Sequence, residues 1–103
     1  MREAYAGTLA RKAAALLELA EGLSRLPAYP GRLADLHREL HTIAGSARTF
    51  GHAQATEQAR QAEALLEPFV CAAANPDEKV WRELKGLLRG LEQTAAASRS
   101  EAA

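Results

Sequence analysis

The 103-residue sequence contains only one cysteine, Cys71, and aromatic residues make up only 5% of it. A single thiol cannot form an internal disulfide or a cysteine-based zinc site, and the apolar neighbours of Cys71 favour a small, buried side chain. Because aromatic volume is scarce while hydrophobic residues reach 48%, the core has to be built mainly from leucine and alanine. Such side chains suit closely packed helices, so we expect an all-α protein.

The chain also lacks an excess of either charge and any long apolar run. Thirteen basic and thirteen acidic residues give a formal net charge of zero, which argues against nucleic-acid binding or electrostatic membrane attachment as the main activity. Charges interrupt every hydrophobic stretch, so none approaches the roughly 18 apolar residues of a membrane span, and the N-terminus shows no signal-peptide pattern. We expect one cytoplasmic domain, too small to hold a nucleotide-binding catalytic domain as well.

What the sequence does contain is a repeated spacing of three and four between apolar residues, which is typical of amphipathic helices packed in a bundle. Four segments carry such a stripe, and the first extends from about Arg2 to Leu26. The predicted core positions are Leu9, Ala13, Leu16, Ala20 and Leu23, then Leu33, Leu36, Leu40, Ile43, Ala47 and Phe50, then Ala55, Ala59, Ala62, Leu66 and Phe69, and finally Val80, Leu84, Leu87 and Leu91, with Trp81 and Leu88 beside them.

Three short breaks separate these segments. Leu26-Pro27-Ala28-Tyr29-Pro30-Gly31 holds two prolines and a glycine, Gly51 suits a helix C-terminus, and Asn75-Pro76-Asp77 interrupts the chain again. Short connections make consecutive helices antiparallel, so the sequence predicts an antiparallel up-down-up-down four-helix bundle over residues 2–97. The small polar residues from Thr94 onward are expected to fray, with residues 98–103 forming a flexible tail or linker.

His41 lies four residues before Gly45 within the second predicted helix. Glycine in a helix interior costs about 1 kcal/mol relative to alanine, so the missing side chain suggests room for another molecule beside the histidine. At roughly 100° per residue, His41 points about 130° away from the core direction of its helix and should be exposed. Five residues lie within about 60° of it, namely His37, Arg38, Ala44, Gly45 and Arg48.

This combination of an exposed histidine, arginines and small residues suits a phosphoryl group. An imidazole is substantially neutral at pH 7, so it can attack phosphorus, and nearby guanidinium groups can stabilise the added negative charge. Small neighbours would let the acidic active site of a partner approach in line. The sequence therefore predicts a phosphoryl-accepting site at His41.

At these residues the sequence resembles the histidine-containing phosphotransfer (Hpt) domains of phosphorelays. Their helical signature has a phosphoacceptor histidine followed by a glycine and a small residue, and here it reads His41-Thr42-Ile43-Ala44-Gly45-Ser46, with Gly51 closing the helix. The other matching positions are Leu40, Ile43 and Phe50 in the family's apolar places, then Ala59, Ala62 and Glu63. Ala44 stands where most of the family has a lysine that helps bind the phosphoryl group, and we expect Arg48, one turn further along the same face, to replace it.

The resemblance implies a phosphocarrier rather than an enzyme. His41 would take a phosphoryl group from the phospho-aspartate of one receiver domain and pass it to the aspartate of another. The expected supporting residues for the phosphate or the partner are Arg48, Gly45, Ala44, His37 and Arg38. The receiver supplies Mg²⁺ and most catalytic groups, so no intrinsic cofactor or metal is expected.

The resemblance also implies which partners the chain has. They are the receiver domains of response regulators, with a hybrid sensor histidine kinase as a further candidate, and we expect the chain itself to be a monomer. Its docking surface is expected on the first two helices around His41. Glu63 either approaches His41 from the third helix or is a solvated charge, and the sequence does not separate these two possibilities.

Three other interpretations use the same residues. His37 and His41, at i and i+4, could bind zinc weakly, but Glu39 does not directly follow the first histidine as a metalloprotease requires. The segment His37-Arg38-Glu39-Leu40-His41-Thr42-Ile43 also resembles the phosphoacceptor motif of sensor-kinase dimerisation helices, although the usual proline and an ATP-binding domain are missing. Finally, Ala44 in place of lysine is compatible with a degenerate bundle that docks a receiver domain without being phosphorylated.

Overall fold

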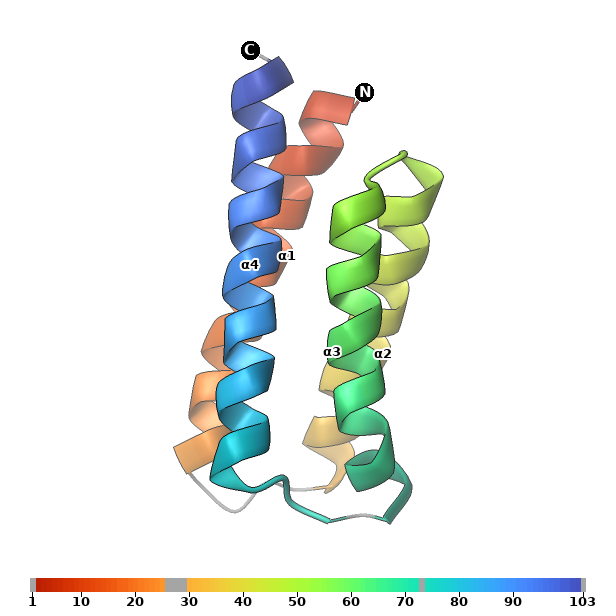
Figure 1. Cartoon of the computed structure of the whole chain (residues 1–103). Helices are drawn as coiled ribbons and strands as arrows, with labels where there is room; N and C mark the ends of the chain where they lie inside the picture. The colour runs from red at the N-terminus through yellow and green to blue at the C-terminus, as the bar shows by residue number, and fades with distance from the viewer. Residues whose placement is uncertain (1, 26–29, 73, 103) are drawn as a thin grey trace.

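The structure, a computed structural model, describes residues 2–25, 30–72 and 74–102. These residues form four helices, α1 (Arg2–Arg25), α2 (Pro30–Thr49), α3 (Ala53–Ala72) and α4 (Glu78–Ala102), and they include no strand. Successive helices run in opposite directions, with α1 packed along α4 and α2 along α3, in a bundle of 41 × 21 × 18 Å (Figure 1). The predicted all-α, antiparallel up-down-up-down bundle is confirmed.

The core is the apolar seam that the spacing of leucine and alanine predicts. The largest fully buried side chains are Leu9, Leu33, Leu36, Leu40, Ile43, Leu66, Leu84, Leu88 and Leu91. Alanines fill the gaps between them, and Ala13, Ala20 and Ala59 are completely buried, which lets the helix backbones approach closely. On α4 the buried face is centred one position away from the predicted stripe, because Trp81 and Leu88 are buried whereas Val80 and Leu87 are only half-buried.

Gly51 ends α2 as its sequence position predicts. Its φ angle is 77°, in the left-handed region that glycine adopts without steric cost. The N–H of Gly51 donates to the carbonyl of Arg48 at 3.1 Å, and the N–H of His52 donates to the carbonyl of Ala47 at 2.8 Å. This pair of hydrogen bonds is a Schellman motif, which satisfies the last carbonyls of the helix and reverses the chain into α3.

Aromatic contacts hold α1 against this turn. Tyr5 stacks on Phe50 with the ring centroids 4.5 Å apart, and its ring centroid lies 5.4 Å from that of His52. Burial raises the pKa of the Tyr5 hydroxyl above its ordinary value, while a side-chain hydrogen bond with Ser46 acts in the opposite direction. Ser46 follows Gly45, so these contacts fix the rotation of α2 on the side that faces α1.

The second and third breaks in the sequence have clear structural counterparts, and the first is placed differently from the prediction. Asp77 caps α4, since its side chain accepts a hydrogen bond from the Val80 N–H at 3.0 Å. Pro30 and Gly31, predicted to lie in a connection, belong to the first turn of α2. The N–H groups of a first turn have no acceptor within the helix, so a proline there costs no hydrogen bond. Residues 26–29 of that connection lie outside the described residues.

Two further expectations are corrected by the structure. Fraying from Thr94 is not observed, because α4 is helical to Ala102 and Ala95 is completely buried in the core. The helix also includes residues 98–102, and their role as a tail or linker stays a prediction. Cys71, predicted to be buried, is exposed in the last turn of α3.

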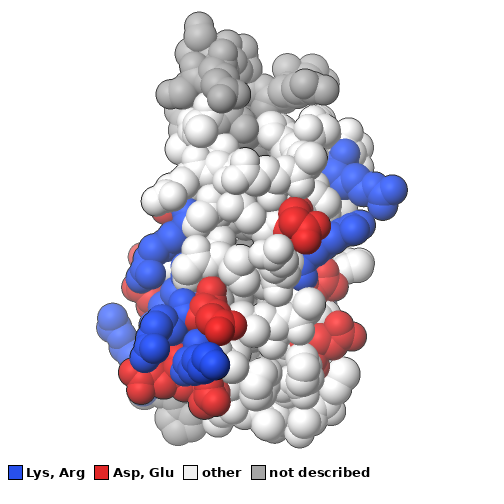
Figure 2. Space-filling view, in the orientation of Figure 1, with Lys and Arg blue, Asp and Glu red and all other residues white. Residues whose placement is uncertain are grey.

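Charged side chains of both signs are mixed on the surface. In Figure 2 they lie side by side at the lower left, over α4, and on the right, over α2 and α3, and neither sign dominates this face. This agrees with the zero formal net charge of the chain. Across residues 2–25, 30–72 and 74–102, no helix is both long enough and apolar enough to cross a membrane.

Candidate functional site

His41 lies in the middle of α2, on the surface that the core residues of the helix leave exposed. Its neighbours Leu40 and Ile43 are buried and fix the rotation of the helix, so the histidine side chain points outward and is 75% exposed. The orientation calculated from helix periodicity is therefore confirmed. An imidazole held on a rigid helix and open to solvent can reach a reacting group on another protein.

Glu63 on α3 holds the imidazole of His41. Its Oε2 atom lies 2.9 Å from Nδ1 of His41, and the Glu63 side chain is only 19% exposed. An ionised carboxylate has no proton to donate, so in this hydrogen bond the proton is on Nδ1 of the histidine. In the neutral imidazole, the lone pair is then on Nε2, which is the nitrogen left available to attack a phosphorus atom.

His37 lies one turn before His41 and faces the same carboxylate. Its Nε2 atom is 3.9 Å from Oε2 of Glu63, which is within ion-pair range but too long for a hydrogen bond. This nitrogen is buried and has no hydrogen-bond partner within the described part of the chain. His37 is therefore adjacent to the site as predicted, and its connection to His41 runs through Glu63.

His41 opens onto a groove of about 320 Å³ between α2 and α3. The lining residues are His41, Ala44, Gly45 and Arg48 of α2, and Arg60, Glu63, Ala64 and Glu67 of α3. Four of the six predicted site residues thus line one groove. Ala44 lines it while being only 5% exposed, so it packs between the helices and is not the open surface position that the helical angle suggested.

Gly45 provides open space rather than a close contact between helices. A Cβ atom built on Gly45 meets nothing within 4 Å, and the residue is exposed. The fold itself therefore does not need glycine at this position, and alanine would favour the helix more. The predicted gap beside His41 is present.

Arg48 is the predicted cation that the structure brings to the groove, and Arg60 of α3 is a second cation that was not among the predicted site residues. Both arginines line the His41 groove, and both also line an adjoining hollow of about 260 Å³ near Gly51. Arg38, by contrast, is paired with Asp35 at 3.4 Å and does not line the groove. The groove therefore does not have the basic strip expected along α2. It has one arginine on α2 and one on α3, with the carboxylates of Glu63 and Glu67 nearby.

The groove lies between a different pair of helices from the one predicted to carry the docking surface. That surface is predicted on the first two helices around His41, whereas the cavity beside His41 is formed by α2 and α3. The opposite flank of α2 is the one that meets α1, through Ser46 and Tyr5. A helical wheel predicts which residues point away from the core, but it does not predict which neighbouring helix they lie beside.

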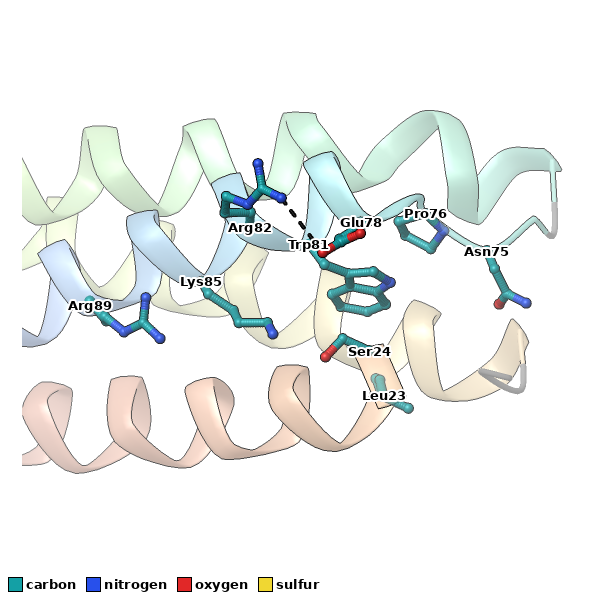
Figure 3. Close-up of a pocket in the computed structure, with 9 residues that line it drawn as sticks. All are labelled: Leu23, Ser24, Asn75, Pro76, Glu78, Trp81, Arg82, Lys85 and Arg89. Atoms are coloured by element: carbon teal, nitrogen blue, oxygen red, sulfur yellow. Dashed lines mark ion pairs between the residues drawn. The ribbon is translucent and has the colours of Figure 1, made fainter. Parts of the chain in front are cut away.

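A larger hollow of about 610 Å³ lies between the end of α1 and the start of α4, and His41 does not line it (Figure 3). Its wall carries Trp81 and three cations of α4. Two of these cations are already paired with carboxylates, Arg82 with Glu78 at 3.6 Å and Arg89 with Glu21 at 3.9 Å. None of the predicted site residues lies there, so the candidate site is the His41 groove. Across the described ranges, no group of three or more His, Cys, Asp or Glu side chains is arranged to hold a metal ion.

A comparison with protein-family models matches the Hpt domain over residues 4–98, which is nearly the whole chain. The chain therefore belongs to the Hpt domain family. No match was found among curated proteins or among solved structures. Membership of this family implies a phosphotransfer role in a two-component phosphorelay, and Hpt domains are phosphocarriers that interact with the receiver domains of response regulators.

Proposed function

We propose that this chain carries a phosphoryl group on His41 between the aspartates of receiver domains. The Nε2 lone pair forms a bond to phosphorus while the bond between phosphorus and the aspartyl oxygen breaks, and the aspartate leaves as a carboxylate. Transfer to a second receiver reverses these bond changes. The observation that carries the proposal is the 2.9 Å hydrogen bond from His41 to Glu63, which directs the proton to Nδ1 while the side chain remains 75% exposed.

Glu63 supports both chemical states of His41 in this mechanism. Before transfer it keeps the proton on Nδ1, and after transfer the ring carries a positive charge that the carboxylate stabilises through the same hydrogen bond. Arg48, which lines the groove, would bind phosphoryl oxygens in place of the lysine that Ala44 replaces. The chain acts as a cytoplasmic monomer without a cofactor of its own, and Mg²⁺ is bound by the receiver.

The direct test is to mix the purified chain with a phosphorylated receiver domain and Mg²⁺ and to map the phosphate by mass spectrometry. We expect one phosphoryl group, labile in acid and stable in base, on His41. A receiver whose phosphorylated aspartate is replaced by asparagine is the control. Binding of several phosphorylated receivers without any transfer would contradict the proposal and favour the degenerate docking bundle. Phosphate on a serine or threonine would contradict it as well.

Gly45→Ala should change stability and phosphotransfer in opposite directions. The free energy of unfolding is expected to rise by about 0.5–1 kcal/mol, since the added methyl group meets nothing in the fold and alanine favours the helix. Transfer from a receiver should slow about tenfold, because displacing reacting atoms by about 1 Å costs up to roughly 100-fold.

Gly86→Ala is the matched control for this prediction. Gly86 is also an exposed helical glycine with open space around its Cβ position, but it lies on α4, away from the His41 groove. Chemical denaturation and transfer kinetics of the two variants should show similar stabilisation and a slow reaction for Gly45→Ala only. Equal transfer rates in both variants would show that the partner does not need the open space at Gly45.

A further inference from the structure

The His41 groove contains two arginines that have no ion-pair partner in the described part of the chain. Arg48 on α2 and Arg60 on α3 both line this groove and the adjoining hollow, so one guanidinium group borders the same space from each helix. Three other arginines do face carboxylates, and these pairs are Arg38 with Asp35, Arg82 with Glu78 and Arg89 with Glu21. The two groove arginines thus remain available to an anion.

Charge along the groove is separated into two ends. Because α2 and α3 are antiparallel and joined by the turn at Gly51, a residue's distance in sequence from Gly51 sets how far along the groove it lies. Arg48 and Arg60 lie nearer the turn, and Glu63 and Glu67 lie further from it. Glu63 accepts the hydrogen bond from Nδ1 of His41, and the two ring nitrogens of an imidazole point in nearly opposite directions. A group attached to Nε2 is therefore directed away from the Glu63 carboxylate.

We infer that Arg60 is a phosphoryl-binding residue, which forms with Arg48 a two-helix oxyanion site at the basic end of the groove. This inference rests on the proposed function of His41 and adds a residue of α3 to it. Guanidinium groups bind phosphate oxygens through paired hydrogen bonds, so two of them can contact a transferring phosphoryl group from both sides. In this chain the position of Ala44 has no cation, and the second positive charge comes from the neighbouring helix.

Phosphoramidate separates binding of the phosphoryl group from docking of a partner, because this small donor has no protein surface. Nε2 of His41 forms the new bond to phosphorus as the P–N bond of phosphoramidate breaks and ammonia leaves, while the Nδ1 proton stays in the hydrogen bond to Glu63. The experiment measures the rate of His41 phosphorylation with phosphoramidate and with a phosphorylated receiver. It compares the wild type with Arg60→Gln, Arg48→Gln, the double variant and the control Arg32→Gln.

We expect Arg60→Gln and Arg48→Gln to slow both reactions about tenfold each, as for the loss of one charge-assisted hydrogen bond, and the double variant to be slower still. Arg32 is an exposed arginine of α2 that does not line the groove, so Arg32→Gln should react like the wild type. If Arg60→Gln slows only the reaction with the receiver, Arg60 contacts the partner and the inference is wrong. Equal rates for Arg60→Gln and Arg32→Gln would also overturn it.

Titration with inorganic phosphate, followed by NMR, provides a readout that is independent of phosphotransfer. Amide shifts at Gly45, Arg48 and Arg60 are expected in the wild type and should be lost in the double variant. If the wild type binds phosphate in this way but is never phosphorylated, the proposed function fails while the oxyanion site stands. Phosphorylation without any shift at these amides, together with a normal rate for Arg60→Gln, would leave the carrier function intact and remove Arg60 from it.

Discussion

Replacing His41 with glutamine is expected to abolish phosphorylation of the chain and to leave its fold intact. The glutamine amide nitrogen is not nucleophilic, because its lone pair is delocalised, so the bond to phosphorus cannot form. The rate should fall to background, a loss of at least about 1,000-fold, as for removal of a nucleophile in covalent catalysis. Transfer from a phosphorylated receiver, measured with a radiolabelled phosphoryl group, checks this result.

The stability of this variant should differ little from that of the wild type. The His41 side chain is 75% exposed, and the buried neighbours Leu40 and Ile43 are unchanged. Loss of the contact with Glu63 should cost about 1 kcal/mol or less, which is typical of exposed pairs. Circular dichroism and chemical denaturation would therefore show an intact bundle, so lost activity can be assigned to the missing nucleophile.

The other two histidines provide matched controls for the identity of the acceptor. His37 faces Glu63 on the same helix, and His52 lies in the α2–α3 turn beside Tyr5. His52→Gln should retain phosphorylation at the wild-type rate, and His37→Gln should retain a phosphate on His41. Phosphate that persists in His41→Gln and disappears in His37→Gln would show that His37, one turn earlier on α2, is the acceptor. That result would contradict the proposal.

The sequence predicts the fold well because its apolar pattern is regular and its breaks are unambiguous. Leucine and alanine at spacings of three and four define one buried face per helix, and that face remains buried through Leu66 although Pro68 lies inside α3. Gly51 marks the end of α2 because a left-handed turn there favours glycine. The pattern fails where burial depends on a neighbour, as at Cys71, which lies among apolar residues but faces solvent.

The site is predicted only in part, because its two halves lie on different helices. Periodicity places Gly45 and Arg48 on the same side of α2 as His41, and no tertiary information is needed for that. The contact with Glu63 joins residues 22 positions apart, so it depends on the register between α2 and α3 that the turn at Gly51 sets. Placing Arg60 beside His41 requires the same register between the helices. Helical spacing alone places residues 60, 63, 64 and 67 on one face of α3, but it does not show that this face meets His41.

Glu63→Ala is the second substitution with a large expected effect, and two opposing contributions decide its sign. Losing the carboxylate removes the hydrogen bond that keeps the proton on Nδ1. In the transition state, where the ring gains positive charge, such a charge-assisted bond is worth about 1.5–3 kcal/mol. It also removes a negative charge that repels the incoming phosphoryl group, but such an effect at a solvent-exposed groove is about 1 kcal/mol or less. The first contribution is the larger, so phosphorylation of His41 should slow by about 10-fold.

Glu67→Ala and Glu63→Gln separate these two contributions. Glu67 lines the same groove without a hydrogen bond to His41, so Glu67→Ala changes only the charge and should leave the rate equal or slightly higher. The amide oxygen of glutamine still accepts a hydrogen bond from Nδ1 but carries no charge, so Glu63→Gln should slow transfer less than Glu63→Ala does. The ¹⁵N shifts of the His41 ring should show a protonated Nδ1 in the wild type and in Glu63→Gln, and a mixture of tautomers in Glu63→Ala. If Glu67→Ala slows transfer as much as Glu63→Ala does, orientation of the imidazole by Glu63 is not what makes His41 reactive.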